Sequence, residues 1–367
     1  MSKWLGLALL GVFGWLPAAF GQQGVAQPAV PVQPAPPVQP TPAQPSPAAV
    51  APARINLDVL VTDSAGKPTP ELEPMDFTLL DNGQPRKILA FRRTDGTVGN
   101  RIDPPEEVII VLDAVNMPYQ AVTILRLQLL KFLRQNGGKL PQPVSVFVFS
   151  SLGLKVHPQP SKDGNALAAI LDTSSGTVRA TGSAAGEFGQ LQEFGDSIKA
   201  LKEIAQGEAR KPGRKLLVWL GTGWPLLNER QFVNTTQSVQ QYFYNIVYVS
   251  RMLREARITL YGIYTLNSSP DQILYEAFLK PIKDIHKANA GNLSLQVLAR
   301  QTGGRVLPAS NEIAGQINSC IADVGEYYTL TFAPPQQMQS DEYHDLKVEV
   351  AKPGLTARTT SGYYNQP

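Results

Sequence analysis

Continuous apolar runs alternate with helix-like segments between residues 105 and 324, and this alternation constrains the fold more than any other feature of the sequence. Between the runs, apolar residues recur at spacings of three and four, as in amphipathic helices. Buried strands separated by helices are typical of a parallel sheet with helices on both faces. We therefore predict an α/β fold with a doubly wound, mainly parallel sheet over residues 105–326. The runs expected to form its strands are 108–112, 144–149, 216–220 and 258–264.

Strand patterns flank this region on both sides. Residues 55–62 alternate between apolar and polar side chains, and Asp81-Asn82-Gly83 supplies a hairpin turn between two further strands. After Gly325, residues 327–333 and 344–350 again have the pattern of strands. Neither set has enough strands for a stable sheet by itself. We therefore predict that residues 54–104 and 327–367 pack together as a small β domain of sandwich type, with the α/β domain inserted between them.

The N-terminal 53 residues predict export rather than a folded domain. Lys3 precedes an apolar run from Trp4 to Phe20, so residues 1–21 are interpreted as a signal peptide, with an uncleaved anchor helix as the alternative. Residues 22–53 carry ten prolines and no charged residue, which is typical of an extended, disordered linker. We expect an exported protein, whether periplasmic, held at the cell surface or secreted, with no transmembrane segment after cleavage. The net charge of +3, from scattered Lys and Arg, indicates no nucleic-acid partner.

A series of short motifs runs along the chain in a fixed order. They are Val59-x-Val61-x-Asp63-x-x-Gly66, Asp76-Phe77, Asp81-Asn82-Gly83, Val108–Asn116, Gly213-Arg214-Lys215 to Gly223, Leu298-Ala299-x-x-Thr302-Gly303-Gly304-Arg305, Tyr327-Tyr328-x-Leu330-x-Phe332-x-Pro334, His344-x-x-Lys347-Val348 and Gly362-Tyr363-Tyr364. In order and number they resemble the bacterial VWFA-related proteins of acidobacterial type, in the von Willebrand factor A domain family. The resemblance covers about residues 54–364. It implies an A-domain fold, which usually serves protein–protein contact, without implying a particular partner.

The resemblance also implies a place for a metal site. The family's metal-ion-dependent adhesion site uses Asp-x-Ser-x-Ser after the first strand, with a threonine and a second aspartate from later loops, because a hard divalent cation needs several oxygen ligands. Here Asp113 keeps the first place, Val115 and Met117 stand in the serine places, and Thr222 stands near the second aspartate. Loose candidates for the threonine are Thr177 and Thr181. We expect a degenerate site in which Asp113 is the remaining metal candidate, with no bound divalent cation and no other cofactor.

Two roles stay open for Asp113. A carboxylate just after a strand can accept backbone N–H groups and fix the loop, or cap the helix that follows, and Asn116 can do the same. Alternatively, a protein-binding rim lies at the carboxyl ends of the strands. The residues of that rim are Asp113, Asn116, Thr222 and Trp224. An exposed Trp224 suits an interface, whereas a tryptophan beside a strand end can equally be packed.

No catalytic residue can be named from the sequence. Gly221-x-Gly223 lacks the third glycine of a dinucleotide site, and the three histidines lack the spacing of a zinc motif. The single cysteine, Cys320, lies in an apolar helical pattern and is interpreted as a buried structural thiol. We therefore expect an exported, non-catalytic adhesion-type module that binds a protein or a cell-envelope component. An exported hydrolase with an unrecognised site and a scaffold subunit of an envelope complex are the alternatives, and the sequence does not predict the oligomeric state.

Overall fold

The structure is a computed structural model. It describes residues 54–69, 71–94, 106–156, 159–173, 187–224, 235–264, 275–336 and 339–365. The predicted signal peptide (1–21), the predicted linker (22–53) and the candidates Thr177 and Thr181 lie outside these residues. Within the described ranges, no helix combines the length and the apolar character that crossing a bilayer requires.

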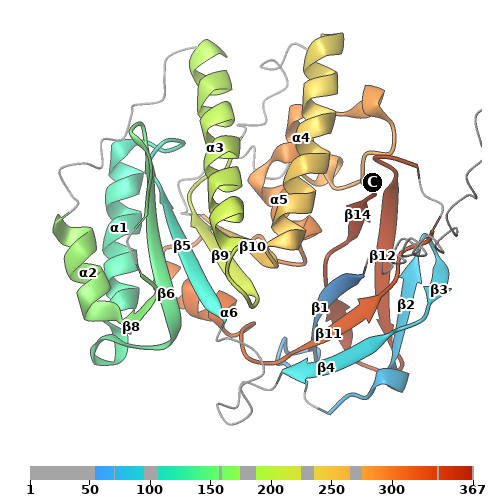
Figure 1. Ribbon diagram of the computed structural model, residues 1–367. Helices are drawn as coiled ribbons and strands as arrows, with labels where there is room; N and C mark the ends of the chain where they lie inside the picture. The colour runs from blue at the N-terminus through green and yellow to red at the C-terminus, as the bar shows by residue number, and fades with distance from the viewer. Residues whose placement is uncertain are drawn as a thin grey trace, which may run out of the picture. The chain divides into compact units, whose positions relative to one another are not determined.

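A six-stranded sheet carries the helices of the molecule (Figure 1). Its order is β10-β9-β5-β6-β7, with β8 paired to β6. Strands β5, β6, β9 and β10 pair in parallel, whereas β7 and β8 run antiparallel to β6. Every residue of β5 and β9 is buried, which explains their nearly unbroken apolar sequences. The bounds are β5 Glu107–Asp113, β6 Lys139–Ser150, β7 Gly153–Val156, β8 Ser161–Asp163, β9 Lys215–Leu220 and β10 Ile258–Ile263.

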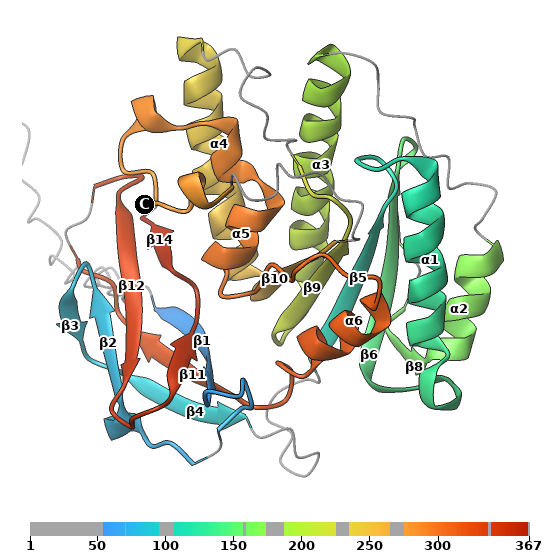
Figure 2. The same cartoon turned by 180° about the vertical axis from the view of Figure 1, so that it is seen from behind.

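Helices cover both faces of this sheet, as the two opposite views show (Figures 1 and 2). Alternate residues of β5 point to alternate faces: Ile109 and Val111 pack against α3, α4 and α5, and Val108 and Ile110 against α1, α2 and α6. The bounds are α1 Tyr119–Leu133, α2 Gly164–Thr173, α3 Glu187–Glu208, α4 Thr236–Glu255, α5 Leu295–Gln301 and α6 Ile313–Ile321. The described residues also include four short 3-10 helices, η1 Pro74–Asp76, η2 Gln135–Gly138, η5 Ile285–Lys287 and η6 Ala290–Leu293.

Two four-stranded antiparallel sheets combine strands from before and after the helical region. Their orders are β13-β1-β11-β4 and β14-β12-β2-β3. Both contribute to one apolar cluster, in which the alternating residues of β1 meet Phe77 of β2 and Leu346 of β12. Their bounds are β1 Ile55–Thr62, β2 Phe77–Asp81, β3 Gln84–Arg86, β4 Ala90–Thr94, β11 Tyr327–Phe332, β12 Tyr343–Val350, β13 Thr356–Arg358 and β14 Gly362–Tyr364.

The predicted hairpin turn at Asn82-Gly83 is confirmed. Asp81 of β2 pairs with Gln84 of β3, and the two residues between them have φ angles of 51° and 76°. Positive φ at both central positions is the geometry of a type I′ turn, which favours Asn followed by Gly.

The predicted fold class, a doubly wound and mainly parallel sheet, is wrong for this chain. Of the fourteen described strands, four pair in parallel, and the other ten pair antiparallel. Part of the difference arises at β6, where a two-residue turn, Ser151-Leu152, is closed by Gly153 at φ 92° and returns the chain along β6. The fold is a mixed α/β arrangement with several antiparallel sheets.

A buried polar cluster joins the six-stranded sheet to the strands that follow α6. Arg214 places Nη1 3.4 Å from Glu106 Oε1 and donates to the main-chain oxygen of Asp323 at 3.0 Å. The carboxylate of Asp323 accepts from the hydroxyl of Tyr261 at 2.8 Å and from the guanidinium of Arg358 in β13. The side chains of Arg214 and Glu106 are only 4% and 6% exposed, so water screens their interaction little.

The residue after Arg214 holds two helices in place. Lys215 Nζ donates to the main-chain oxygens of Glu208 at 2.9 Å, Lys211 at 2.6 Å and Ala256 at 3.2 Å. Glu208 ends α3 and Ala256 follows α4, so the ammonium lies at the negative ends of two helix dipoles. Burial lowers the pKa of Lys215, and the charge of Glu208 opposes that change. The Gly213-Arg214-Lys215 motif therefore has a structural role in this chain.

Candidate functional site

The carboxylate of Asp113 lies at the carboxyl end of β5 and is completely buried. Its Oδ1 accepts from the backbone N–H groups of Val115 at 2.9 Å and Asn116 at 3.0 Å. Its Oδ2 accepts from the side-chain amide of Asn116 at 2.8 Å and from the indole N–H of Trp219 at 2.9 Å. Each oxygen thus has two donors from the protein, and the arrangement fixes the loop between β5 and α1. Of the two roles left open for this carboxylate, these contacts are those of the structural one.

Hydrogen bonds from Asn116 and Thr222 connect this loop to its neighbours. Asn116 Nδ2 also donates to Ser197 Oγ of α3 at 3.0 Å, and Thr222 Oγ1, after β9, donates to the main-chain oxygen of Asn116 at 2.8 Å. Gly221 is required beside them because a Cβ there would lie 2.7 Å from Asp113 Cβ. The ends of β5 and β9 and one turn of α3 are therefore held as one unit.

Burial dominates the electrostatics of Asp113. Desolvation raises the pKa of its carboxyl group, and the hydrogen bonds from Asn116, Trp219 and Val115 oppose that rise. The net pKa stays above the ordinary value of an aspartate, since hydrogen bonds from neutral donors do not fully replace bulk water.

Trp224 is packed rather than exposed. Its side chain is 1% exposed, and its ring meets that of Trp219 edge to face at a centroid distance of 4.5 Å. Its main-chain oxygen accepts from the N–H of Leu295 at 3.0 Å, which ties the loop to α5. Of the four residues predicted to line a binding rim, Asp113 and Trp224 are out of reach of a partner, and Asn116 and Thr222 are half-buried. The structure brings the four together, but mainly as packing around the strand ends.

The donor set around Asp113 does not match a divalent cation. Such a cation needs several oxygen ligands, and the family site would draw them from positions 115 and 117. Val115 and Met117 offer none and are buried in apolar clusters. The lone pairs of Asp113 are already directed at N–H groups. A bound cation would have to displace the Trp219 and Asn116 donors.

Three exposed apolar residues on α1 were missed by the sequence reasoning. Tyr119, Ile124 and Leu127 are 64%, 43% and 58% exposed. At about 100° per residue, positions 119, 127 and 124 fall within an arc of about 140° around the helix. Ile124 and Leu127 are neighbours at i, i+3. We call these three residues the α1 stripe. The sequence contained the signal: the buried side of this helix is already supplied by Val122, Leu125, Leu129 and Phe132, so the remaining apolar residues had to face elsewhere.

The β6–β7 turn exposes another large apolar side chain. Leu152 is 76% exposed. In both cartoon views the start of α1 and this turn lie at the same end of the six-stranded sheet (Figures 1 and 2). This end is therefore bordered by apolar side chains, although not by the tryptophan that the sequence suggested.

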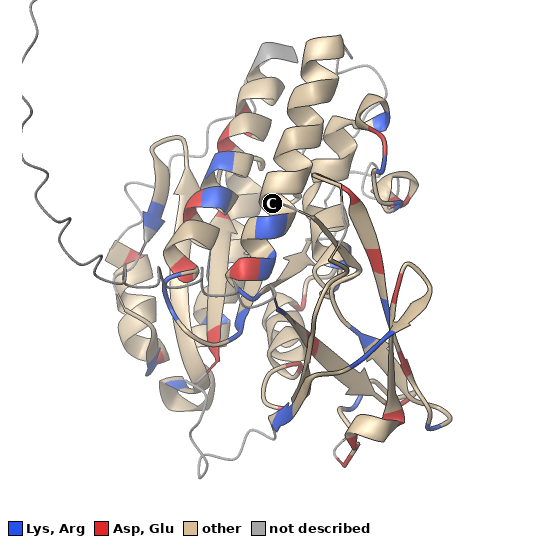
Figure 3. Cartoon of the chain, turned by 45° about the vertical axis from the view of Figure 1, so that its right-hand side comes forward, with Lys and Arg blue, Asp and Glu red and all other residues tan. Residues whose placement is uncertain are grey.

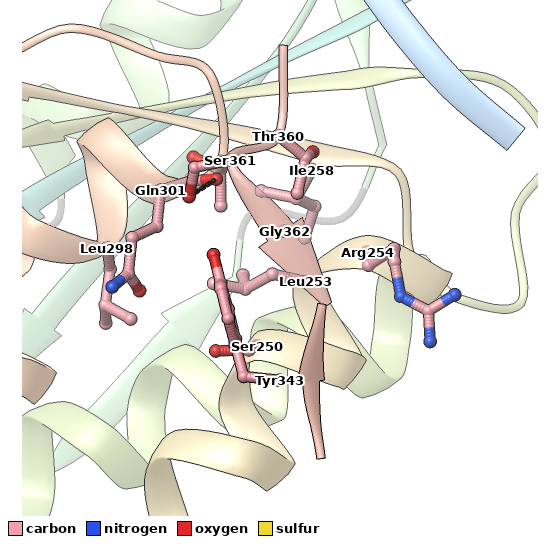
Figure 4. Close-up of a pocket in the computed structure, with 11 residues that line it drawn as sticks. Ser250, Leu253, Arg254, Ile258, Leu298, Gln301, Tyr343, Thr360, Ser361 and Gly362 are labelled. Carbon is pink, nitrogen blue, oxygen red and sulfur yellow. Dashed lines mark hydrogen bonds between the residues drawn. The ribbon is translucent and has the colours of Figure 1, made fainter. Parts of the chain in front are cut away.

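A small pocket lies between α4, α5 and the last strands (Figure 4). Its walls include Arg254, Gln301, Tyr343 and Ser361, with the Tyr343 and Gln301 side chains directed toward its interior. It offers about 20 Å³ of solvent space, which is room for about one water molecule. A substrate of ordinary size does not fit there.

Cys320 is a buried free thiol of α6, as predicted. Burial raises its pKa to about 12, so the reactive thiolate is scarce at neutral pH. We expect Cys320 in the folded protein to react with an aromatic disulfide reagent about 100-fold more slowly than in urea-unfolded protein, because reaction requires local opening. Absorbance of the released thiolate measures both rates. Equal rates would contradict the structural interpretation.

No protein-family model matches the chain, and no curated protein matches it. Among solved structures, the human COPII-coat protein Sec24c is 11% identical with a TM-score of 0.37, and the match covers 74% of this chain and 45% of Sec24c. The PilB minor pilin from Streptococcus sanguinis is 13% identical with a TM-score of 0.33, covering 62% of this chain and 63% of the pilin. The pilus adhesin SpaC from Lactobacillus rhamnosus GG is 9% identical with a TM-score of 0.34, covering 84% of this chain and 49% of SpaC. The chain thus spans less than two thirds of each of these proteins. At these identities and scores the neighbours identify neither a family nor a function, so the A-domain resemblance stays a prediction.

Proposed function

We propose that this protein is an exported, non-catalytic adhesion-type module that binds another protein through the α1 stripe, without a divalent cation. The partner would be a component of the cell envelope or of the cell exterior. The observation that carries the proposal is the stripe itself: a tyrosine, an isoleucine and a leucine on one helix, all at least 43% exposed.

The exposure of these residues points to a partner because α1 already has a complete buried side. Val122, Leu125 and Leu129 of that side are at most 2% exposed. Outward-facing apolar residues contribute nothing to the core and carry a solubility cost, and where they form a larger patch they mark a contact with another macromolecule. Tyr119 adds an aromatic ring with a polar tip, a residue type enriched at interaction hot spots.

Two further observations favour a binding module over a hydrolase. The pocket beside α4 and α5 is too small for a substrate. Among the described residues, no group of three or more His, Cys, Asp or Glu side chains could hold a metal ion. An enzyme would instead bring titratable groups together in a roomy pocket.

We expect that substituting acidic residues into the α1 stripe abolishes capture of the partner protein. The immobilised protein would be incubated with solubilised envelope from the source organism, and retained proteins would be quantified by mass spectrometry. The amount of one captured protein should fall at least about tenfold with the Ile124→Asp/Leu127→Asp variant. The reason is that apolar contacts are replaced by charges that must be desolvated. Binding of that protein, once purified, would then be measured by calorimetry.

A matched control is available in η1 and in the segment just before β4. Met75 and Leu89 are 84% and 45% exposed, and the Met75→Asp/Leu89→Asp variant introduces the same two charges away from α1. Capture by this control should equal that by the wild type. If all three proteins retain the same set, the α1 stripe is not the binding surface. If sedimentation shows that the stripe variant instead disrupts a dimer, a second copy of the chain is the occupant and the proposal fails.

A further inference from the structure

The chain contains two Asn-Gly steps, and both have the same kind of backbone geometry. Asn82-Gly83 has φ angles of 51° and 76°, and Asn136-Gly137, inside η2, has φ angles of 51° and 67°. All four residues are exposed. An asparagine before a glycine cyclises readily, because glycine has no side chain to hinder attack of its nitrogen on the asparagine side chain. The two steps therefore differ mainly in what holds them in place.

Asn82 is held by a strand that is far away in the sequence. Its N–H donates to the main-chain oxygen of Asp345 at 2.8 Å, and its Oδ1 accepts from the N–H of Asp345 at 3.0 Å. Strand β2, which leads into the turn, pairs with β3 on one side and with β12 on the other. Freeing the Asn82 side chain therefore requires β2 to separate from β12 at this end of the sheet.

Asn136 is held by local bonds of a short 3-10 helix. Its main-chain oxygen accepts from the N–H of Lys139, and the next main-chain oxygen, that of Gly137, accepts from Asn165 Nδ2 at 2.8 Å. The Asn136 side chain makes no hydrogen bond with any residue that the structure describes. A 3-10 turn has poorer hydrogen-bond geometry than an α-helix, and such short elements open locally without global unfolding. Asn136 can therefore reach a reactive conformation by breaking few interactions.

We propose that Asn136 is a deamidation site of the folded protein, whereas the fold protects Asn82. In the reaction, the nitrogen of Gly137 forms a bond to Asn136 Cγ, and the bond from Cγ to Nδ2 breaks. The proton of the Gly137 N–H leaves with the side-chain NH₂ group as ammonia. Water then opens the cyclic imide at one of its two carbonyl groups, which leaves aspartate or isoaspartate. The proposal concerns a chemical modification and so goes beyond the binding function assigned to the α1 stripe.

The segment around η2 has little room for the isoaspartate product, which lengthens the main chain by one methylene group. A Cβ on Gly164, the first residue of α2, would overlap the main-chain oxygen of Leu133 at the end of α1. A Cβ on Gly138 would overlap the side chain of Asn165. Because α1, η2 and α2 pack this closely, we expect the added group to displace the Gly137 oxygen from Asn165.

Either product also places a new negative charge just after α1. Lys and Arg positions are interspersed with Asp and Glu positions over the helices and strands (Figure 3), so one carboxylate is a small change to the charge of the whole molecule. Its position matters more, because the C-terminal end of a helix is the negative end of its dipole. Arg134, which follows α1, already pairs with Asp172 at 2.6 Å. We therefore expect the deamidated protein to melt at a lower temperature than the unmodified protein.

The test incubates the full chain in mildly alkaline buffer and follows each Asn-Gly step by peptide mapping with mass spectrometry. In the folded protein, Asn136 should be converted at least about fivefold faster than Asn82, because Asn82 must first break its hydrogen bonds to Asp345. In urea-unfolded protein, the two steps should react within about twofold of each other, because the contacts that distinguish them are gone.

Asn136→Gln is the matched variant, because a glutamine at this position would have to form a larger, six-membered ring. Conversion at this step should then fall below detection, while Asn82 reacts as in the wild type. Asn82→Gln is the reciprocal control and should leave the conversion of Asn136 unchanged.

The comparison of the two steps within the wild-type protein does not depend on the folding of either variant. Equal rates in the folded protein, or faster conversion of Asn82, would overturn the proposal. So would conversion of Asn136 only in the unfolded chain. An equally strong preference for Asn136 in the unfolded chain would also overturn it, because the local sequence would then account for the difference.

Discussion

Replacing Asp113 with alanine is expected to lower the free energy of unfolding by about 4 kcal/mol, because several buried donors lose their acceptor at a cost of about 1–3 kcal/mol each. The donors are two backbone N–H groups, the Asn116 amide and the Trp219 indole N–H. Asn116 keeps its bond to Ser197, which moderates the loss. Urea denaturation at neutral pH measures the change, with an unaltered slope showing that the unfolded state is the same.

Asp113→Asn is the matched control, because it keeps the shape of the side chain. Its amide oxygen can accept from two of the donors, but its NH₂ group then faces the other two. We expect a loss of about 2 kcal/mol, between the wild type and the alanine variant. An alanine variant as stable as the wild type would show that the carboxylate is not what holds the loop.

The pH dependence of this effect has a definite sign. Burial raises the folded-state pKa of Asp113 above its ordinary value, so the folded protein holds the proton more tightly than the unfolded chain does. The contribution of this group to stability therefore falls as pH rises from the ordinary aspartate pKa through the raised one. The asparagine variant cannot titrate there, so its stability should fall less than that of the wild type over this pH interval.

The same variants test the proposed independence from metal. If the site holds no cation, Mg²⁺ and Ca²⁺ should leave the melting temperature of the wild type unchanged, because only a ligand of the folded state stabilises it. A rise in melting temperature that disappears in Asp113→Ala would contradict the proposal. A rise that persists in the variant would place the cation elsewhere.

Local sequence patterns predicted the elements better than their pairing. The run 108–112 is apolar at every position, so its burial as part of β5 could be foreseen, as could the turn at Asn82-Gly83. The fold class was wrong because strand direction depends on contacts between distant segments. β1 pairs antiparallel with β11 and β13, hundreds of residues later, and no local period encodes the direction or the register of that pairing.

The hydrogen bonds of the candidate site also divide into local ones, which the sequence indicated, and long-range ones, which it did not. The backbone N–H groups of Val115 and Asn116 donate to Asp113 from two and three residues away, and the sequence indicated such local hydrogen bonds. The bond from Trp219 spans 106 residues and depends on β5 and β9 being neighbours. The burial of Trp224 likewise involves distant residues, because it shares an apolar cluster with Leu295 and Leu298 of α5. Exposure on α1 was foreseeable in principle, since a helix has one buried side and the extra apolar residues could be counted.

Replacing Arg214 with methionine is expected to cost about 3–5 kcal/mol of unfolding free energy, the range for removing one member of a buried ion pair. Among the described residues, the variant leaves Glu106, which is 6% exposed, with one backbone donor, the N–H of Gly325 at 3.0 Å. It also removes the hydrogen bond to the main-chain oxygen of Asp323 and the contact of the guanidinium with the Tyr327 ring, 5.0 Å from its centroid. Burial already raises the pKa of Glu106, with the Arg214 charge opposing it, so the carboxyl group of the variant should take up a proton at higher pH.

The double variant Glu106→Leu/Arg214→Met separates the pair's attraction from the cost of an isolated charge. Replacing both members of a buried pair by apolar residues of similar volume is often neutral or stabilising. We expect the double variant to recover at least about 2 kcal/mol relative to Arg214→Met alone, and a double-mutant cycle with Glu106→Leu gives the coupling energy. If the double variant is instead less stable than Arg214→Met, the main contribution of Arg214 lies in its bonds to Asp323 and Tyr327 rather than to Glu106. The connection between the six-stranded sheet and the strand that begins at Tyr327 would then depend on a cation at the end of α6. Arg214→Lys should restore little of the lost stability, because one ammonium cannot reproduce the contacts that the planar guanidinium makes.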